Sequence, residues 1–339
     1  MSNAFNLPVI LNIPDLPKYL KQVESRMDNV LGAGQSQLNT AVLRLTKAHG
    51  KRLRPTLVIA AALLGSSGID DSVIAAAGAV ELIHIGSLVH DDIIDEAHQR
   101  WGIDTINAKE GLDTAILAGD YIFSKACQLA AEANQQVGII AAQTIAALSE
   151  GQAAEIAFCY DVSRTKADLE KAIYGKTAAL LSAACRMGGI CSGHNDDQQT
   201  ALSYFGEDFG TSFQLIDDVL DFVSSAVQLG KPVGNDVKEG VYTLPVILGL
   251  GGSQRMAIIT ELDKKTVATS KLIQTLLDGG CIEKTISKAY SYSHSAQNGL
   301  LTEYGESAEE LAALPARYID WALGSLVAPK YQADIMRSA

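Results

Sequence analysis

Proline is missing from the middle of this chain, because none occurs between Pro55 and Pro232. An interior proline costs a helix about 3 kcal/mol, so a long proline-free tract rich in alanine, leucine and isoleucine favours long helices. Alternating runs of valine, threonine and tyrosine joined by tight Asn-Gly or Asp-Gly turns do not appear either. The sequence therefore predicts an all-α protein.

Cysteine and positive charge are also scarce. The five cysteines are scattered without a C-x-x-C pair, which argues against a disulfide framework or a zinc site. The formal net charge of −12 argues against binding of nucleic acid by bulk electrostatics. No run of about 18 uncharged apolar residues is flanked like a membrane span, and no signal peptide is apparent. We expect a protein of the reduced cytoplasm.

No linker or low-complexity tract divides the chain, so we expect one domain over residues 1–339. Periodicity and helix breakers predict more than ten helices, with a core of about 36–250 and C-terminal helices over 255–326. The expected helices cover about 15–31, 36–48, 55–64, 70–96, 112–133, 136–159, 166–189, 196–222, 241–250, 255–262, 267–278, 282–301 and 306–326. We expect loops at 97–111 and 223–240.

The most informative pattern is D-D-x-x-D, which occurs over 91–95 and again over 217–221. Both copies lie in apolar stretches, where buried carboxylates are costly unless something neutralises them. The first and last aspartate of each copy are at i and i+4, so they share a helix face and can bind Mg²⁺. A solvated acidic face is the simpler alternative, which explains one such cluster better than two. The pair predicts diphosphate chemistry with Mg²⁺ in an apolar pocket.

Basic residues near helix starts suit an anionic substrate. In "GKRLRP", Lys51 and Arg54 are at i and i+3 and form an anion clamp, to which the helix N-terminus adds partial positive charge. Arg100, five residues after the first cluster, is another candidate phosphate ligand. Basic residues at helix starts are usually surface residues, so neither feature is specific alone.

Further candidates accompany the second cluster. Lys176 and Thr177 precede an apolar run, and a lysine there needs an anionic partner, for which we expect a phosphate. Gln214 lies one helical turn before the second cluster, where its amide can donate to a phosphate oxygen. Lys231 is in a glycine- and proline-rich loop that could fold over the acidic helix ends.

Taken together, "GKRLRP", "LVHDDIIDE", "GKT", "FQLIDDVLDF" and "GKPVGND" resemble the trans-isoprenyl diphosphate synthases, the polyprenyl synthetase family, in its medium- and long-chain type. The matches run in family order from about 50 to 245. The resemblance implies an all-α bundle around a central cavity, a homodimer, and about three Mg²⁺ ions held with the substrate diphosphate. It implies head-to-tail condensation of isopentenyl diphosphate with geranyl, farnesyl or geranylgeranyl diphosphate, with peripheral membrane contact for product release.

The resemblance also implies roles for individual residues. The metal ligands would be Asp91, Asp95, Asp217 and Asp221; Asp92, Asp218 and Lys176 would complete the catalytic set. The allylic diphosphate would be bound by Arg100, Lys176, Thr177, Gln214 and Lys231. Isopentenyl diphosphate would be bound by Lys51, Arg54 and His84. All these residues match family motifs at their positions in this sequence.

Two departures reduce the positive charge that the resemblance implies. Trp101 follows Arg100 where the family commonly has a second arginine that helps to bind isopentenyl diphosphate. Val241 stands where the family often has a lysine. Both replacements put substrate affinity in question more than the reaction class.

The chain length of the product would depend on the residues before the first cluster. Gly86 and Ser87 are small, whereas bulky aromatic residues at these positions block the growing chain in the family. With Val80 and Ile83 farther along the helix, they predict an open pocket and a product longer than farnesyl diphosphate. The alternative is that Gly86 serves close helix packing.

Other functions remain open at this point. A farnesyl or geranylgeranyl diphosphate synthase would share the reaction, and a subunit of a heteromeric synthase would be expected to lose the acidic motifs. A terpene cyclase or a head-to-head synthase would not need the "GKRLRP" clamp for a second diphosphate. A helical scaffold protein would leave the paired acidic clusters unexplained.

Overall fold

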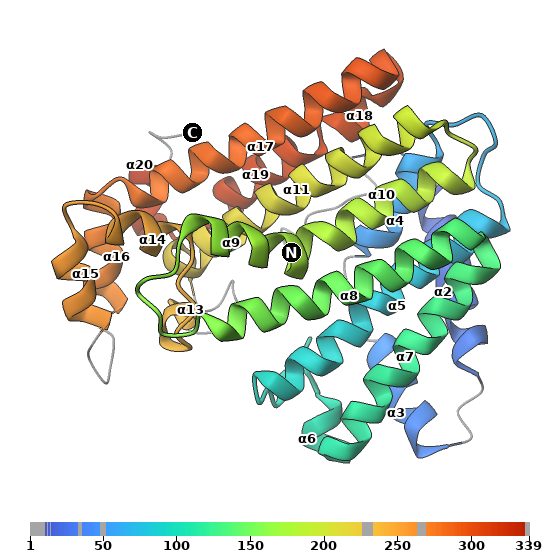
Figure 1. Ribbon diagram of the computed structural model, residues 1–339, viewed down its shortest axis with the longest axis horizontal. Coiled ribbons are helices and arrows are strands. Elements are labelled where there is room, and N and C mark those ends of the chain that lie inside the picture. Colours follow the sequence, from blue (N-terminus) through green and yellow to red (C-terminus); the bar gives the residue numbers. More distant parts are fainter. Residues whose placement is uncertain are drawn as a thin grey trace.

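The computed structural model describes residues 11, 13, 15–32, 36–47, 52–225, 233–262 and 269–335. In this part of the chain nearly all regular structure is helical, in agreement with the predicted fold class. Helices α17 (Cys281–Tyr304), α11 (Asp196–Val223) and α10 (Ala179–Cys191) lie in succession, each against the next (Figure 1). α10 also packs on α4 (Leu53–Ala62), α5 (Asp71–Ile94) and α8 (Gln135–Ala157).

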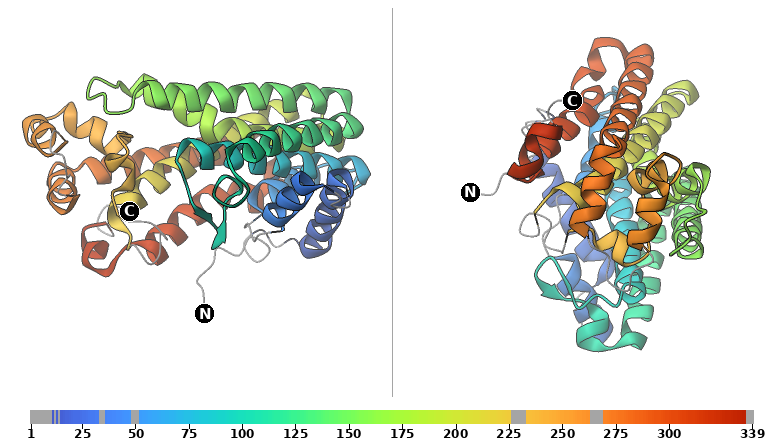
Figure 2. Two further views of the ribbon diagram at one scale, coloured as in Figure 1. Left: turned by 90° about the horizontal axis from the view of Figure 1, so that it is seen from below. Right: turned by 90° about the vertical axis from the view of Figure 1, so that its left-hand side faces the viewer.

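The remaining helices surround these elements. They are α2 (Leu16–Leu31), α3 (Gln37–Thr46), α6 (Ile106–Glu110), α7 (Leu112–Ala133), α9 (Lys166–Ile173), α13 (Asn235–Lys238), α14 (Leu244–Leu250), α15 (Arg255–Leu262), α16 (Thr269–Asp278), α18 (Glu309–Ala312), α19 (Leu314–Leu326) and α20 (Pro329–Ile335). α14, α15 and α16 gather at one end of the molecule, and α2, α3 and α6 lie toward the opposite side (Figures 1 and 2).

α5 is the central helix. It contacts α7, α4, α10 and α2, and residues on nearly all of its faces are buried until its last turns. A helix that is apolar all round belongs in a core or a membrane. By length and composition α5 could cross a membrane, but 78% of its apolar window is buried inside the fold. Burial in the core therefore accounts for its apolar sequence.

The starts of the two acidic helices are fixed by local capping. Asp70 precedes α5, and its side chain accepts hydrogen bonds from the backbone N–H groups of Ser72 (2.9 Å) and Val73 (3.1 Å). Asn195 and Gln198 form a reciprocal capping box at the start of α11. Each helix begins at a defined residue, which fixes where its acidic C-terminal end lies.

The structure corrects several predicted boundaries. The expected helix over 166–189 is divided by a π-helical turn, η1 (Tyr174–Ala178). The expected loop over 97–111 contains α6 and a two-stranded antiparallel hairpin, β1 (Gln99–Arg100) and β2 (Ile103–Asp104). The expected loop over 223–240 contains the short α13.

The C-terminal prediction also needed correction. The segment predicted as one helix over 306–326 is a 3₁₀ turn, η2 (Gly305–Ala308), followed by α18 and α19. Pro315 lies in the first turn of α19, where a missing N–H costs nothing. α20, which follows α19, was not predicted.

Candidate active site

The C-terminal ends of α5 and α11 open on one cavity of about 570 Å³. We call it the acidic cavity. Its wall includes Asp95 from the first cluster and Asp217 and Asp218 from the second. The predicted residues Arg100, Lys176 and Gln214 also line it, together with Glu155, Asn235, Asp236, Glu239, Val241 and Thr243. Two sequence motifs more than 100 residues apart thus meet at one place.

The first cluster is flanked by cations. Burial raises the pKa of Asp91 to about 6, and Lys176 is the largest influence acting in the opposite direction. Asp95 follows the last residue of α5 and is exposed; its backbone N–H donates to the Asp91 carbonyl at 2.8 Å. Asp92 is buried; its Oδ1 accepts a hydrogen bond from Nε of Arg100 at 2.7 Å and is ion-paired with Nη2 at 2.7 Å. Arg100 is therefore held beside the carboxylates from the hairpin that follows α5.

The described hydrogen bonds to the second cluster come from neutral donors. Asp217 is exposed to the cavity, and its Oδ1 accepts from the Tyr318 hydroxyl of α19 at 2.8 Å. Asp218 is buried; its Oδ1 accepts from Gln214 at 2.9 Å, while its Oδ2 has no hydrogen-bond partner among the described residues. Burial raises the pKa of Asp218 well above the ordinary value for aspartate. An added cation near Asp218 would favour the ionised form of this carboxylate.

Asp221, predicted as a metal ligand, takes a different position. It is 1% exposed and is not part of the cavity wall. Its Oδ2 accepts from the backbone N–H of Asp236 at 3.3 Å, and its carbonyl accepts from Gly234 at 2.8 Å. These contacts hold the segment at 234–236 against α11. In this structure Asp221 therefore fixes the backbone next to the cavity and does not line it.

Lys176 has an anionic partner that the sequence did not indicate. Its ammonium is ion-paired with Glu155 of α8. Burial lowers the pKa of Lys176, but the Glu155, Asp91 and Asp95 carboxylates outweigh burial and the net shift is upward. The phosphate contact predicted for Lys176 stays a prediction beside this ion pair.

The contact between Lys176 and Glu155 depends on two glycines. A Cβ added to Gly151 would lie 2.6 Å from the Gly175 backbone, so α8 and η1 touch backbone to backbone. No side chain other than hydrogen fits in that space. The π-helical turn that contains Lys176 is a distortion of the kind often found at functional sites.

Thr177 and Gln214 form a short chain of hydrogen bonds with the second cluster. The Thr177 hydroxyl donates to Gln214 Oε1 at 2.7 Å, and Gln214 Nε2 donates to Asp218 at 2.9 Å. This orients the Gln214 amide toward Asp218, whereas the sequence suggested a contact with phosphate. Both residues therefore arrange the second cluster in this structure.

The structure describes Arg54 and His84 of the predicted site for a second diphosphate. Arg54 is half-buried, its Nε has no hydrogen-bond partner among the described residues, and burial lowers its pKa to about 10. Burial and the nearby Arg54 charge hold the pKa of His84 well below its usual value, so its ring is neutral. Lys51 lies outside the described residues, as does Lys231 of the allylic set.

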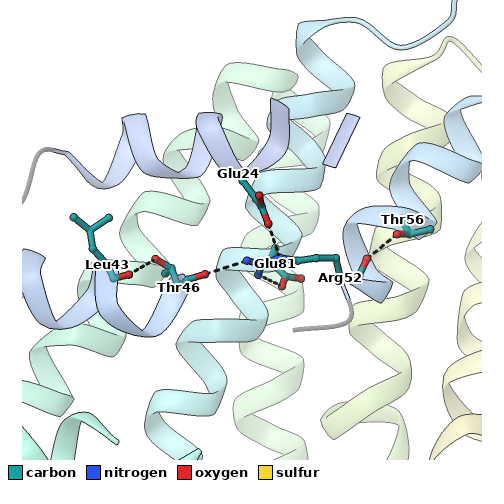
Figure 3. Close-up of polar contacts among 6 residues, drawn as sticks. All are labelled: Glu24, Leu43, Thr46, Arg52, Thr56 and Glu81. Atoms are coloured by element: carbon teal, nitrogen blue, oxygen red, sulfur yellow. Dashed lines mark hydrogen bonds and ion pairs between the residues drawn. The ribbon is translucent and has the colours of Figure 1, made fainter. Parts of the chain in front are cut away.

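Arg52 fixes the start of α4 that carries Arg54 (Figure 3). Its guanidinium donates to Glu81 of α5 at 2.7 Å and to the Thr46 carbonyl at 3.0 Å, and Glu24 lies at 3.4 Å. Its backbone is left-handed, with φ of 51°. Arg52 thus contacts three helices, and Arg54 is the arginine of the motif that remains predicted to bind the substrate.

The predicted chain-length residues of α5 differ in burial and in contacts. Val80 and Ile83 are fully buried. Ser87 is half-buried, and its hydroxyl donates to the His84 carbonyl at 2.8 Å. Gly86 packs against α7, where an added Cβ would lie 2.9 Å from the Phe123 ring. The close helix packing weighed as the alternative at Gly86 is therefore present.

Sequence reasoning missed Glu155 and Tyr318. Neither belongs to a motif, and both are brought to the clusters by tertiary packing of α8 and α19. The two departures from the family pattern differ in position. Trp101 is 40% exposed in the turn between β1 and β2, whereas Val241 lines the acidic cavity. Only the Val241 change removes charge from the described cavity wall.

The described carboxylates do not form a finished metal cage. No group of three or more His, Cys, Asp or Glu side chains within the described ranges is close enough to hold an ion unaided. Mg²⁺ usually takes one or two carboxylates and completes its shell with water and substrate phosphates. The buried Oδ2 of Asp218 and the cavity-facing Asp95 and Asp217 are oxygen donors of this kind. The donor set fits Mg²⁺ that enters with a diphosphate.

A comparison with known families decides the assignment. The polyprenyl synthetase profile matches residues 35–278, which include both acidic clusters and every described residue of the acidic cavity. The chain belongs to the polyprenyl synthetase family. The family predicted from the motifs is thereby confirmed, and so is the transfer of prenyl groups as the class of reaction.

Curated relatives agree with the medium- and long-chain branch of the polyprenyl synthetases. This polyprenyl synthetase is 38% identical over 229 residues to a nonaprenyl diphosphate synthase of Mycobacterium tuberculosis, covering 68% of each chain. It is 36% identical over 248 residues to heptaprenyl diphosphate synthase component 2 of Geobacillus stearothermophilus, covering 73% of this chain and 77% of the relative.

Solved structures share the whole fold. The crystal structure of a polyprenyl synthase from Caulobacter crescentus, complexed with calcium and isoprenyl diphosphate, matches with a TM-score of 0.77. The match covers 89% of this chain and 94% of that one, at 28% identity. The all-α isoprenoid synthase fold predicted from the sequence is confirmed.

Proposed function

We propose that this chain condenses isopentenyl diphosphate head-to-tail with an allylic diphosphate and releases a longer all-trans polyprenyl diphosphate. The observation that carries the proposal is the meeting of Asp95, Asp217 and Asp218 with Arg100 and Lys176 around one cavity. This arrangement suits a diphosphate that is bound with divalent cations and leaves as an anion.

We propose Mg²⁺ as the cation. Asp91, Asp95 and Asp217 would hold it together with the substrate diphosphate, and Asp218 would support them. Bound Mg²⁺ would neutralise the departing diphosphate and so help the allylic C–O bond to ionise. The Caulobacter structure, with calcium and isoprenyl diphosphate bound, supports a divalent cation in this fold.

The side chains of the chain itself bind and orient. Arg100, fixed by Asp92, and Lys176, fixed by Glu155, present positive charge to the allylic diphosphate. Arg54 offers a guanidinium with an unused Nε to the second diphosphate. His84 is neutral, so it can donate a hydrogen bond without placing a positive charge beside Arg54. Apolar α5 residues exclude water from a reactive cation.

We propose a product longer than farnesyl diphosphate. One relative is named a nonaprenyl diphosphate synthase and another a component of a heptaprenyl diphosphate synthase, and Ser87 is a small residue four positions before the first cluster. The packing of Gly86 against Phe123 means that Gly86 contributes less open space than the sequence suggested. A shorter-chain synthase remains the alternative.

We propose a homodimer in the cytoplasm, with peripheral membrane contact during product release. Apolar side chains on the outer faces of α7 and α8, such as Ile116, Leu117 and Ile139, are more than 40% exposed and suit a partner surface. The relative from Geobacillus is named a component, so a heteromeric synthase is the second candidate.

One assay separates these candidates. The purified chain is incubated with Mg²⁺, isopentenyl diphosphate and farnesyl diphosphate, and the products are separated by chromatography. Long polyprenyl diphosphates from this chain alone are expected. Absence of condensation by the folded chain would contradict the proposal, and activity that appears only with a second protein would favour the heteromeric synthase. A product that stops at geranylgeranyl diphosphate would contradict the longer chain length.

A further inference from the structure

Arg164 has no part in the function described so far, although its environment is unusual. It lies in the connection between α8 and α9 and is only 4% exposed. Its Nη1 donates to the Tyr242 carbonyl at 3.2 Å. Its Nε and Nη2 are buried and have no hydrogen-bond partner among the described residues. A guanidinium has five N–H donors, and burying it with most of them unused is costly.

Two side-chain oxygen atoms of the cavity wall, which can accept hydrogen bonds, lie near Arg164. The Oδ2 of Asp218 and the Oγ1 of Thr243 are also buried without a hydrogen-bond partner in the described ranges. Both residues line the acidic cavity, and Thr243 directly follows the residue whose carbonyl Arg164 holds. Burial lowers the pKa of Arg164, while Glu155 and then Asp218 act against that shift. The charge of Arg164 therefore acts on carboxylates of the cavity.

The cavity wall itself is short of positive charge. Its acidic residues are Asp95, Glu155, Asp217, Asp218, Asp236 and Glu239, and its described basic residues are Arg100 and Lys176. Both of these bases are already ion-paired, one with Asp92 and the other with Glu155. At the end formed by residues 241–243, the wall presents Val241, which carries no charge. An anion there would meet carboxylates and an aliphatic side chain.

We infer that Arg164 is a positioning residue for the allylic diphosphate. From directly behind residues 241–243 it supplies the positive charge that Val241 does not, and it holds the Tyr242 backbone in place. The inference rests on the proposed function, because it names a further determinant of the same site. A charge behind the wall still lowers the energy of an anion in front of it, since the intervening medium is not water.

A purely structural role makes different predictions. If Arg164 only tied the α8–α9 connection to Tyr242, its loss would lower stability, and a cation introduced elsewhere would not compensate. If its charge matters, a lysine at position 241 should compensate, because Val241 faces the cavity directly. The combination of Arg164→Gln with Val241→Lys therefore distinguishes the two roles.

The experiment compares Arg164→Gln, Arg164→Lys and Arg164→Gln/Val241→Lys with the unaltered chain. Arg255→Gln is the matched control, because Arg255 also donates one guanidinium hydrogen bond to a carbonyl, that of Leu250 at 3.0 Å, outside the acidic cavity. Binding of inorganic pyrophosphate with Mg²⁺ is measured by calorimetry, the KM of each substrate by steady-state kinetics, and the fold by thermal melting.

Arg164→Gln is expected to weaken pyrophosphate binding and raise the allylic KM by roughly tenfold, with the isopentenyl diphosphate KM changed by less than about twofold. Val241→Lys should recover most of this loss, and Arg164→Lys should stay within about threefold because the charge is kept. Pyrophosphate binding within about twofold of normal in folded Arg164→Gln would overturn the inference. So would a failure of Val241→Lys to restore binding.

If Arg164→Gln does not fold, Arg164→Lys decides, since a loss of about tenfold despite the retained charge would also overturn the inference. Failure of the proposed function would look different: the unaltered chain would form no condensation product, whatever residue stood at position 164.

Discussion

The two acidic clusters share a sequence pattern but not an environment. Around the first cluster the protein supplies cations, with Arg100 on Asp92 and Lys176 close to Asp91. Around the second, the hydrogen bonds among the described residues come from neutral donors, the Tyr318 hydroxyl on Asp217 and the Gln214 amide on Asp218, and the charges of Arg54 and Arg164 act on these carboxylates without a described hydrogen bond to them. Identical motifs at the ends of two helices are therefore compensated differently by their neighbours.

This difference indicates which cluster depends more on added metal. A neighbouring guanidinium or ammonium lowers the pKa of a carboxylate, whereas burial raises it. Asp218, with its raised pKa and a buried Oδ2 that has no partner among the described residues, is the clearest case. We expect the second cluster to respond more strongly to Mg²⁺ than the first.

The largest expected effect comes from removing a carboxylate that we propose as a metal ligand. Asp91→Ala and Asp217→Ala should each lower turnover by roughly a thousandfold or more, because each removes charge that would hold the metal–diphosphate group. Asp196→Ala, in the first turn of α11, is the control and should leave turnover unchanged. Near-normal rates in the Asp91 or the Asp217 variant, measured with saturating substrates, would show that the metal role of that residue is wrong.

Gly151→Ala tests the geometry beside the first cluster. The new methyl would lie 2.6 Å from the Gly175 backbone and push α8 away from η1, which separates Glu155 from Lys176. We expect a loss of about 2 kcal/mol in unfolding free energy and a clear fall in turnover. Gly138→Ala on the same helix meets its neighbours at 3.4 Å and should be tolerated. Equal melting temperatures for the two variants would contradict this account.

Through the titration of Asp91, the metal-free protein should become less stable as the pH rises from about 4 to 6. Burial raises the folded-state pKa of Asp91 to about 6, above its ordinary value of 3.8. The folded state then holds the proton that the unfolded state has lost, so unfolding is favoured progressively across this range. Asp218 contributes with the same sign.

Asp218→Asn should remove the part of this loss of stability that Asp218 contributes. At pH 7 without metal, its melting temperature is expected to exceed that of the unaltered chain by about 2 °C, after allowance for solvent screening. Mg²⁺ with pyrophosphate should stabilise the unaltered chain more than the variant. A variant that melts lower at every pH would refute the idea that Asp218 is strained without metal.

Tyr318→Phe should have the smallest effect on turnover. It removes one neutral donor from Asp217, so we expect kcat/KM to fall by about threefold to tenfold and the Mg²⁺ requirement to rise. Tyr290→Phe is the matched control, because the Tyr290 hydroxyl donates to Asp320 at 2.7 Å, and neither residue lines the acidic cavity. An equal change in both variants would mean that the Tyr318 contact has no special role.

Some features of this site could be predicted from the sequence alone. The i, i+4 spacing predicted that Asp91 and Asp95 share a helix face, and the proline-free tract predicted the helices that carry both clusters. Residues outside motifs could not be found in this way. Glu155 reaches Lys176 only because Gly151 and Gly175 touch.

Side-chain partners were the least predictable part. Lys176 needed an anion, but sequence periodicity does not distinguish a carboxylate on α8 from a substrate phosphate. Asp221 repeats the spacing of Asp95, yet the segment at 234–236 folds over it and removes it from the cavity wall. Such differences depend on chain segments that follow the motif and on how they fold back.

The most direct test of the central claim is to locate the metal. Crystals grown with Mn²⁺ in place of Mg²⁺, together with inorganic pyrophosphate, would show the ions by anomalous scattering. The account predicts ions between the pyrophosphate and both clusters, with Asp91 or Asp95 on one side and Asp217 on the other. Pyrophosphate bound without any ion at Asp217, or ions only outside the acidic cavity, would contradict it.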